Sequence, residues 1–164
     1  MVSSVATIEN LTIESFEKGI GVNVRGTVFT VQKALPLMSA GGSIVVTGST
    51  SASRGRAGFG VYSASKAAVR QFARVWAAEL APRGIRVNTV TPGPTDTPGL
   101  RGIAGGDADV EKAILAGMAS KVPLGRVGNP TEIANAVLFL ASDQASFMTR
   151  SEIFVDGGDV QVFL

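Results

Sequence analysis

The 164-residue sequence contains no cysteine and no histidine, and these two absences exclude several kinds of site. Without cysteine there is no disulfide framework, and without either residue there is no zinc or haem site built on them. A Ser-His-Asp or Cys-His catalytic set is equally impossible. We therefore expect no metal site, and any acid-base chemistry must depend on tyrosine, lysine, aspartate or glutamate.

An excess of charge of one sign is also absent, because 15 basic and 13 acidic side chains leave a formal net charge of +2. So small an excess of positive charge does not indicate a surface that binds nucleic acid. No apolar run is long enough to span a membrane, and the first residues lack the basic start and apolar stretch of a secretory signal. We expect no nucleic-acid or membrane partner, and a cytoplasmic protein.

The sequence does contain 45% apolar residues, which is ample for a core, with 20 glycines and 7 prolines between the apolar segments. Periodicity and capping residues predict alternating helices and strands joined by loops over 49–60 and 95–107. Helices are expected over 12–38, with a bend near Gly19 and Gly21, and over 62–80, 109–120 and 129–140; strands are expected over 43–48, 85–90 and 152–155. This order predicts one α/β domain with a small parallel sheet and an unpaired first edge.

Three polar side chains in this pattern could carry chemistry. Tyr62, the only tyrosine, begins a predicted helix, and Lys66 lies one turn later on the same face. An ammonium close to a phenol favours the phenolate form, so together they could donate or accept a proton. Ser49 follows a predicted strand at the edge where α/β sheets place ligands. Taken alone, these residues also fit a surface lysine beside a half-buried tyrosine and a turn serine.

Several stretches, taken together and in order, resemble the short-chain dehydrogenase/reductase family. Each is a modest signal alone, but the set is specific and covers nearly the whole chain. The stretches are Val22-Asn23-Val24-Arg25-Gly26, Ser43-Ile44-Val45-Val46-Thr47-Gly48-Ser49, Tyr62-Ser63-Ala64-Ser65-Lys66, Arg86-Val87-Asn88-Thr89-Val90-Thr91-Pro92-Gly93 and Phe154-Val155-Asp156-Gly157-Gly158. The resemblance implies a Rossmann-like parallel sheet with flanking helices, truncated to its last three strands.

The resemblance also implies an NAD- or NADP-dependent oxidoreductase acting on a small carbonyl or alcohol. Tyr62 would be the general acid/base, and Lys66 would bind the nicotinamide ribose and favour the phenolate. Ser49 would orient the substrate oxygen. Asn23, which alone would pass for a helix-bend residue, would hold a water that relays protons from Lys66 to solvent.

Further expectations concern the cofactor, the substrate lid and self-association. Pro92 and Gly93 would allow close approach to the nicotinamide, with Thr95 and Thr97 near its carboxamide. Residues of about 95–121 would form a lid over the substrate. The helices over 23–38 and 62–80 would join subunits of a homo-oligomer, with Phe72 and Trp76 as core or interface residues.

The sequence also departs from the family pattern. It contains no Gly-x-x-x-Gly-x-Gly turn to cradle the pyrophosphate at a helix N-terminus. Gly48, Thr95 and Arg150 replace a more usual serine, a β-branched aliphatic residue and a glycine. We therefore expect a partial domain of residues 1–164, corresponding to the catalytic and substrate half. It is either part of an active enzyme, as a truncated gene product, an internal-start reading frame or a fragment, or a non-catalytic remnant serving as an oligomerisation or interaction module.

Overall fold

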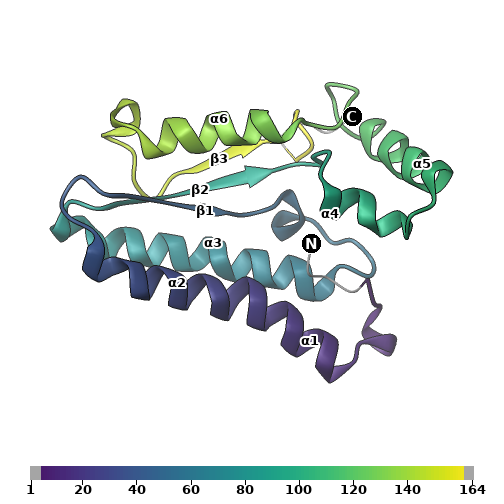
Figure 1. Cartoon of the computed structure of the whole chain (residues 1–164), viewed down its shortest axis with the longest axis horizontal. Helices are drawn as coiled ribbons and strands as arrows, with labels where there is room; N and C mark the ends of the chain where they lie inside the picture. Colours follow the sequence, from purple (N-terminus) through teal and green to yellow (C-terminus); the bar gives the residue numbers. More distant parts are fainter. Residues whose placement is uncertain (1–4, 161–164) are drawn as a thin grey trace.

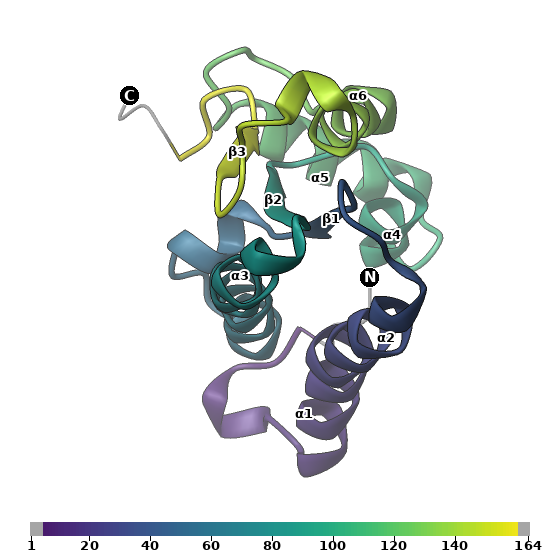
Figure 2. The same cartoon turned by 90° about the vertical axis from the view of Figure 1, so that its left-hand side faces the viewer.

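The computed structural model describes residues 5–160 as a three-layer arrangement (Figure 1). Strands β1 (Ser43–Thr47), β2 (Arg86–Pro92) and β3 (Glu152–Val155) form a parallel sheet in the order β1-β2-β3. Helices α2 (Thr27–Ala34) and α3 (Gly60–Leu80) lie on one side of it, and α6 (Pro130–Ala141) lies on the other, as the end view in Figure 2 also shows. The predicted α/β architecture with three parallel strands is confirmed.

The central strand β2 explains why the sheet needs helices on both faces. Val87 and Val90 are fully buried and belong to different hydrophobic clusters. Val87 packs with Val69, Ala73 and other residues of α3, whereas Val90 packs with Leu140 of α6. A short β-branched run buried on both faces is typical of a parallel strand.

Helix α3 presents one buried stripe to the sheet. Its fully or nearly fully buried residues recur every three or four positions, as an amphipathic helix requires, and are Ser65, Val69, Ala73, Ala77 and Leu80. Trp76 packs against the same cluster, and its ring stacks on Phe72 with the centroids 5.5 Å apart.

The predicted bent helix over 12–38 is present as consecutive helical segments from Ile13 to Leu37. It begins as expected, because Thr12 Oγ1 accepts a hydrogen bond from Ser15 N and caps α1 (Ile13–Ile20). The expected bend is a π-helical turn, η2 (Gly21–Gly26), and α2 follows it and ends in a 3-10 turn, η3 (Leu35–Leu37). A π turn accommodates one extra residue and rotates the side chains beyond it.

The two predicted loops contain short helical turns. Residues 49–60 include the 3-10 turn η4 (Thr50–Ser53), and α3 begins at Gly60. Residues 95–107 include α4 (Pro98–Arg101) and the 3-10 turn η6 (Gly102–Ala104), before α5 (Ala108–Ala119). Figure 1 shows α4 and α5 beyond the ends of the strands to which the arrows point.

The remaining sequence signals describe the local structure correctly. Asn129 and Glu132 form the expected capping box at the start of α6, and β3 has the predicted bounds. Strand β2 runs two residues further than predicted, because Pro92 pairs with Val155 and Gly93 N donates to the Val155 carbonyl. Within residues 5–160, no helix combines the length and apolar character needed to cross a membrane.

Candidate active site

Ser49 lies directly beyond β1, at the carboxyl edge of the sheet. Its backbone is extended, and its Oγ accepts a hydrogen bond from Ser51 N over 3.2 Å, which caps η4. The residue is only 8% exposed. Because this contact uses an oxygen lone pair, the hydroxyl proton of Ser49 remains available to a substrate oxygen.

Tyr62 and Lys66 lie in the first two turns of α3, which begins at the same edge. The Lys66 ammonium lies 5.9 Å from the centroid of the Tyr62 ring and donates a hydrogen bond over 2.9 Å to the main-chain oxygen of Thr47. Burial lowers the pKa of Lys66, since removal from water disfavours its charged form. The structure therefore places the pair beside the end of β1, where Ser49 follows.

Asn23 reaches the same helix from the π turn. Its Nδ2 donates to Ser65 Oγ over 3.0 Å, and Ser65 Oγ donates to the Tyr62 main-chain oxygen over 2.7 Å. The Asn23 main-chain oxygen accepts a hydrogen bond from Thr27 Oγ1. Ser65 was not among the predicted site residues, although it stands within the motif that contains Tyr62 and Lys66.

Pro92 and Gly93 stand where β2 leaves the sheet. A Cβ atom at Gly93 would lie 2.7 Å from the Asp156 Cα atom, a distance that real Cβ atoms do not reach. The close approach of two backbones therefore already requires glycine at this position. Asp156 in turn caps the following glycine turn, accepting from Gly158 N over 2.9 Å.

Thr95 and Thr97 hold the segment beyond this exit. Thr95 Oγ1 donates to the Gly93 main-chain oxygen, and Thr97 Oγ1 accepts from Leu100 N and caps α4. Both threonines therefore follow the carboxyl end of β2, and their predicted contact with the carboxamide stays a prediction. Each hydroxyl already has a contact within its own loop.

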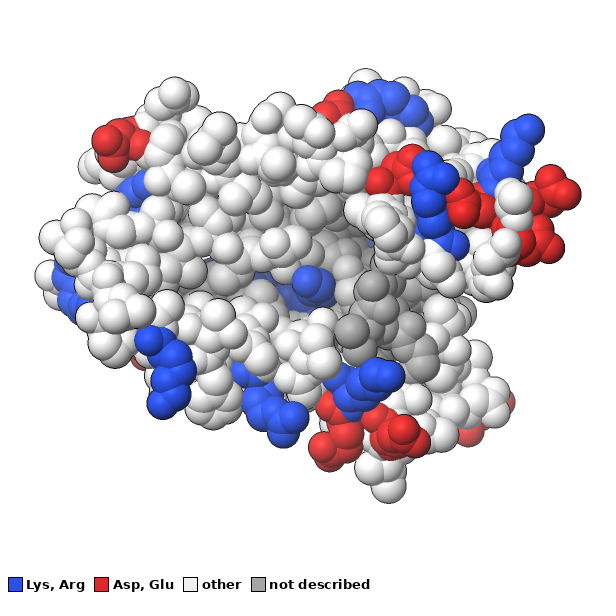
Figure 3. Space-filling view, viewed as in Figure 1, with Lys and Arg blue, Asp and Glu red and all other residues white. Residues whose placement is uncertain are grey.

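An ion network joins this segment to α5. Arg101 binds both carboxylate oxygens of Asp96 at 2.7 Å, and its remaining terminal nitrogen binds Glu111. The hydrogen bond from Arg101 lowers the pKa of the Asp96 carboxyl. Figure 3 shows alternating positive and negative side chains at the end of the molecule where α4 and α5 lie.

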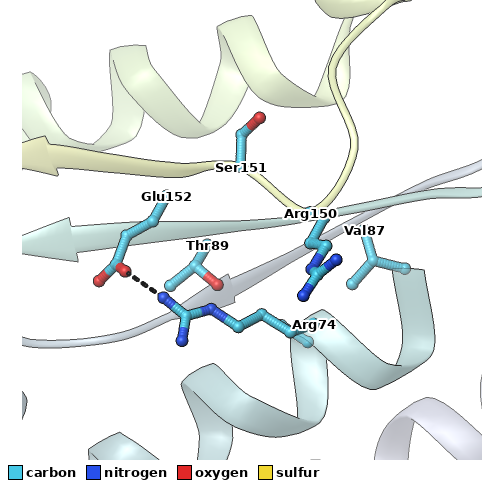
Figure 4. A pocket seen from close by; sticks show the side chains of 7 residues that line it. Arg74, Val87, Thr89, Arg150, Ser151 and Glu152 are labelled. Carbon is cyan, nitrogen blue, oxygen red and sulfur yellow. Dashed lines mark ion pairs between the residues drawn. The ribbon is translucent and has the colours of Figure 1, made fainter. Parts of the chain in front are cut away.

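Two hollows lie elsewhere on the molecule. One, of about 480 Å³, is lined by α5 and the segment 125–127. The other lies where β2 and β3 begin, between Arg74, Arg150 and Glu152 (Figure 4), and has no interior room for water. Ser49, Tyr62 and Lys66 line neither of them. No three acidic side chains within residues 5–160 converge in a way that could hold a metal ion.

The structure shows the local environment of two of the residues that depart from the family pattern, Gly48 and Arg150. A Cβ atom at Gly48 would lie 2.7 Å from Thr91 Oγ1, and Thr91 is held there by its hydrogen bond to Glu152. A serine at position 48 would therefore collide with Thr91. Arg150 adopts a φ of 60°, the left-handed conformation that glycine adopts without strain, and the turn is preserved because Arg150 N donates to the Val87 carbonyl.

Comparison with known proteins gives a consistent family assignment. Residues 2–159 match the family model described as Enoyl-(Acyl carrier protein) reductase. The chain is 42% identical over 159 residues to the oxidoreductase asL5 of Sarocladium schorii, covering 93% of this chain and 59% of that protein. The chain spans about three fifths of the length of the curated relatives it matches.

Solved structures agree with the sequence matches. A short chain dehydrogenase/reductase family protein superposes with a TM-score of 0.83 at 41% identity, covering 98% of this chain and 64% of the other. A blue fluorescent protein from a metagenomic library, solved in complex with NADPH, superposes with a TM-score of 0.82 at 33% identity, covering 94% and 60%.

Proposed function

The chain belongs to the short-chain dehydrogenase/reductase family, and on that premise we propose that it takes part in hydride transfer between NAD or NADP and a carbonyl or alcohol substrate. The relatives that it matches carry the names of oxidoreductases and reductases, which favours an enzyme over a non-catalytic interaction module. The observation that carries the proposal is the position of Tyr62 and Lys66 on α3. Lys66 donates a hydrogen bond to the main-chain oxygen of Thr47, the last residue of β1.

Tyr62 is the general acid/base. In carbonyl reduction it gives its phenolic proton to the substrate oxygen, and in alcohol oxidation the phenolate takes that proton back. The nicotinamide supplies or accepts the hydride when it is bound. Lys66, held beside the ring, stabilises the phenolate through its charge.

Ser49 orients the substrate by donating its hydroxyl proton to the reacting oxygen. Its burial supports this role, because a hydrogen bond in a site shielded from water is stronger than one in bulk solvent. Asn23 contacts the same helix through Ser65 and would hold the water that relays protons from Lys66 to solvent.

The residues present suit the nicotinamide half of a dinucleotide better than its pyrophosphate. Lys66 has two further N–H bonds besides the one given to Thr47, and these would hold the ribose hydroxyls. Pro92, Gly93, Thr95 and Thr97 would line the carboxamide side. The 164 residues contain no Gly-x-x-x-Gly-x-Gly turn for the phosphates, so we expect this chain to hold the dinucleotide weakly.

Residues of about 95–121 act as a lid over the substrate. They lie beyond the carboxyl ends of the strands (Figure 1), where ligands bind in open α/β sheets. The Arg101 contacts to Asp96 and Glu111 tie the start of this segment to α5. The lid therefore moves as a connected unit rather than as a loose loop.

Self-association uses the faces of helices α2 and α3, within the predicted segments 23–38 and 62–80. Phe29 on α2 is 50% exposed and Val75 on α3 is 43% exposed. Apolar side chains of this size on neighbouring helices suit contact with a second copy. Sedimentation equilibrium of the chain, compared with a Phe29→Asp variant, tests this part of the proposal: a monomer in both would contradict it.

The proposed activity is tested by mixing the chain with NADH or NADPH at millimolar concentration and a panel of aldehydes and ketones. We expect nicotinamide oxidation that depends on the carbonyl compound and that Ser49→Ala slows by about 10²-fold or more, since the substrate oxygen loses its hydrogen-bond donor. Absence of carbonyl-dependent oxidation with either dinucleotide would contradict the proposal and favour the non-catalytic module.

A further inference from the structure

Ser65 connects the π turn to the helix that carries Tyr62 and Lys66. It is fully buried, accepts a hydrogen bond from Asn23 Nδ2 at 3.0 Å and donates one to the Tyr62 main-chain oxygen at 2.7 Å. Asn23 and Ser65 are 42 positions apart in the sequence, so the contact exists only in the folded chain. Both partners of Ser65 belong to the proposed site.

The count of protons at Ser65 determines the direction of this chain of hydrogen bonds. A serine hydroxyl has one proton, and a main-chain carbonyl oxygen can only accept. Because Ser65 gives its proton to Tyr62, its oxygen can only accept from Asn23. The two ends of an asparagine amide differ in this respect, and only Nδ2 donates. The Nδ2 end of Asn23 must therefore face Ser65.

The backbone of Asn23 is held as well. Its main-chain oxygen accepts from Thr27 Oγ1 over 2.8 Å, inside the π turn that brings Asn23 toward α3. One of the two Nδ2 N–H bonds is committed to Ser65, so the side chain keeps a second N–H donor and the acceptor oxygen Oδ1, both in a defined orientation.

We propose that Ser65 is a positioning residue, which fixes the direction of the Asn23 amide and so ties the π turn to the helix that carries Tyr62 and Lys66. This inference rests on the proposed function for its purpose. The contact itself can be tested without turnover, because it predicts the behaviour of the Asn23 side-chain protons in the resting chain.

The first experiment measures hydrogen exchange of the Asn23 side-chain amide by NMR in the full chain. We expect its protons to exchange about tenfold more slowly than those of an exposed asparagine such as Asn135, and Ser65→Ala to remove that protection. Ser63→Ala is the matched control, because Ser63 lies in the same helical turn and its buried Oγ has no hydrogen-bond partner among the described residues. Protection should persist in this control.

A second variant removes the donor rather than the acceptor. Asn23→Asp keeps the shape of the side chain but has no N–H to give to Ser65. In the carbonyl-reduction assay, we expect Ser65→Ala and Asn23→Asp each to lower kcat by about tenfold with little change in KM, and the double variant to be no slower than the worse single one.

Three results would overturn the inference: unprotected Asn23 side-chain protons in the unaltered chain, equal loss of protection in Ser63→Ala and Ser65→Ala, or rates that multiply in the double variant. The first can be observed even if Ser65→Ala does not fold. None of the exchange results depends on turnover, so failure of the proposed oxidoreductase activity would be recognised separately, by the absence of carbonyl-dependent oxidation.

Discussion

The Lys66 ammonium donates a hydrogen bond to the main-chain oxygen of Thr47, 2.9 Å away. This contact joins the second turn of α3 to the last residue of β1, and so fixes where Tyr62 stands relative to Ser49 at the exit of the same strand. A helix and a strand that are held together at this edge give the proposed site a rigid base.

Replacing Lys66 should change how stability depends on pH. Burial lowers the pKa of Lys66 in the folded chain, so between that value and the higher unfolded pKa the unfolded chain binds more protons. The free energy of unfolding therefore rises with pH across this window, and the full cost of burying the charge is present below it. Lys66→Met should remove both the cost and the alkaline rise. Urea unfolding at a series of pH values measures this.

The control for this experiment is Lys33→Met, which changes an exposed lysine on α2. It should leave the pH dependence of the unaltered chain in place. An identical alkaline rise in Lys66→Met and Lys33→Met would show that Lys66 is not its source.

Gly48 and Thr91 should behave as a coupled pair. Gly48→Ala places a Cβ atom 2.7 Å from Thr91 Oγ1, and we expect this collision to destabilise the chain by about 1–3 kcal/mol. In Gly48→Ala/Thr91→Ala the cost should be smaller than the sum of the two single changes, because the colliding oxygen is gone. Urea denaturation of the four proteins measures the coupling, and strict additivity would contradict the packing argument.

Removing the Arg101 guanidinium should loosen the lid without unfolding the domain. Arg101→Met breaks both contacts that join Asp96 to Glu111, so amide hydrogens of α5 should exchange several-fold faster while the urea midpoint stays unchanged. Lys112→Met, on the exposed face of the same helix, is the control. If the amide hydrogens of α5 exchange at equal rates in the unaltered chain and in Arg101→Met, the contacts of Arg101 with Asp96 and Glu111 do not restrain this helix.

Dinucleotide binding by this chain should be weak. The sequence has no glycine-rich phosphate turn, and the loss of several charge-assisted contacts costs several kcal/mol of binding free energy. Titration calorimetry with NADH and NADPH should therefore give little or no heat at micromolar concentrations. A micromolar dissociation constant for either would show that other residues of the chain hold the phosphates.

The strands and the longer helices could be predicted because their signals are local. The β-branched run Ile44-Val45-Val46 predicts β1 without any tertiary information, and Asn129 with Glu132 predicts the start of α6 from cap chemistry alone. Local signals also place Tyr62 at the start of a predicted helix and Ser49 after a predicted strand, but the roles predicted for them and for Lys66 come from the resemblance to the short-chain dehydrogenase/reductase family.

What could not be predicted depends on contacts between distant segments. Two glycines indicate an irregularity near Asn23, but the π turn is where Asn23 meets Ser65 across 42 positions. Likewise, the sequence predicts close approach of the cofactor at Gly93, and the contact of Gly93 with Asp156, which also requires glycine, is visible only in the folded chain. Helix α4 was missed because four residues give too short a pattern, although Thr97 and Pro98 are a recognisable start signal.

The most direct test of the central claim compares the unaltered chain with Tyr62→Phe in a single-turnover measurement of hydride transfer at millimolar NAD(P)H, which offsets weak binding. The account predicts that the unaltered chain oxidises the nicotinamide in the presence of a carbonyl substrate. It also predicts that Tyr62→Phe slows this step by about 10²–10⁴-fold with unchanged dinucleotide binding, because only the proton donor is lost. Equal rates in the two proteins would contradict the assignment of Tyr62 as the general acid/base.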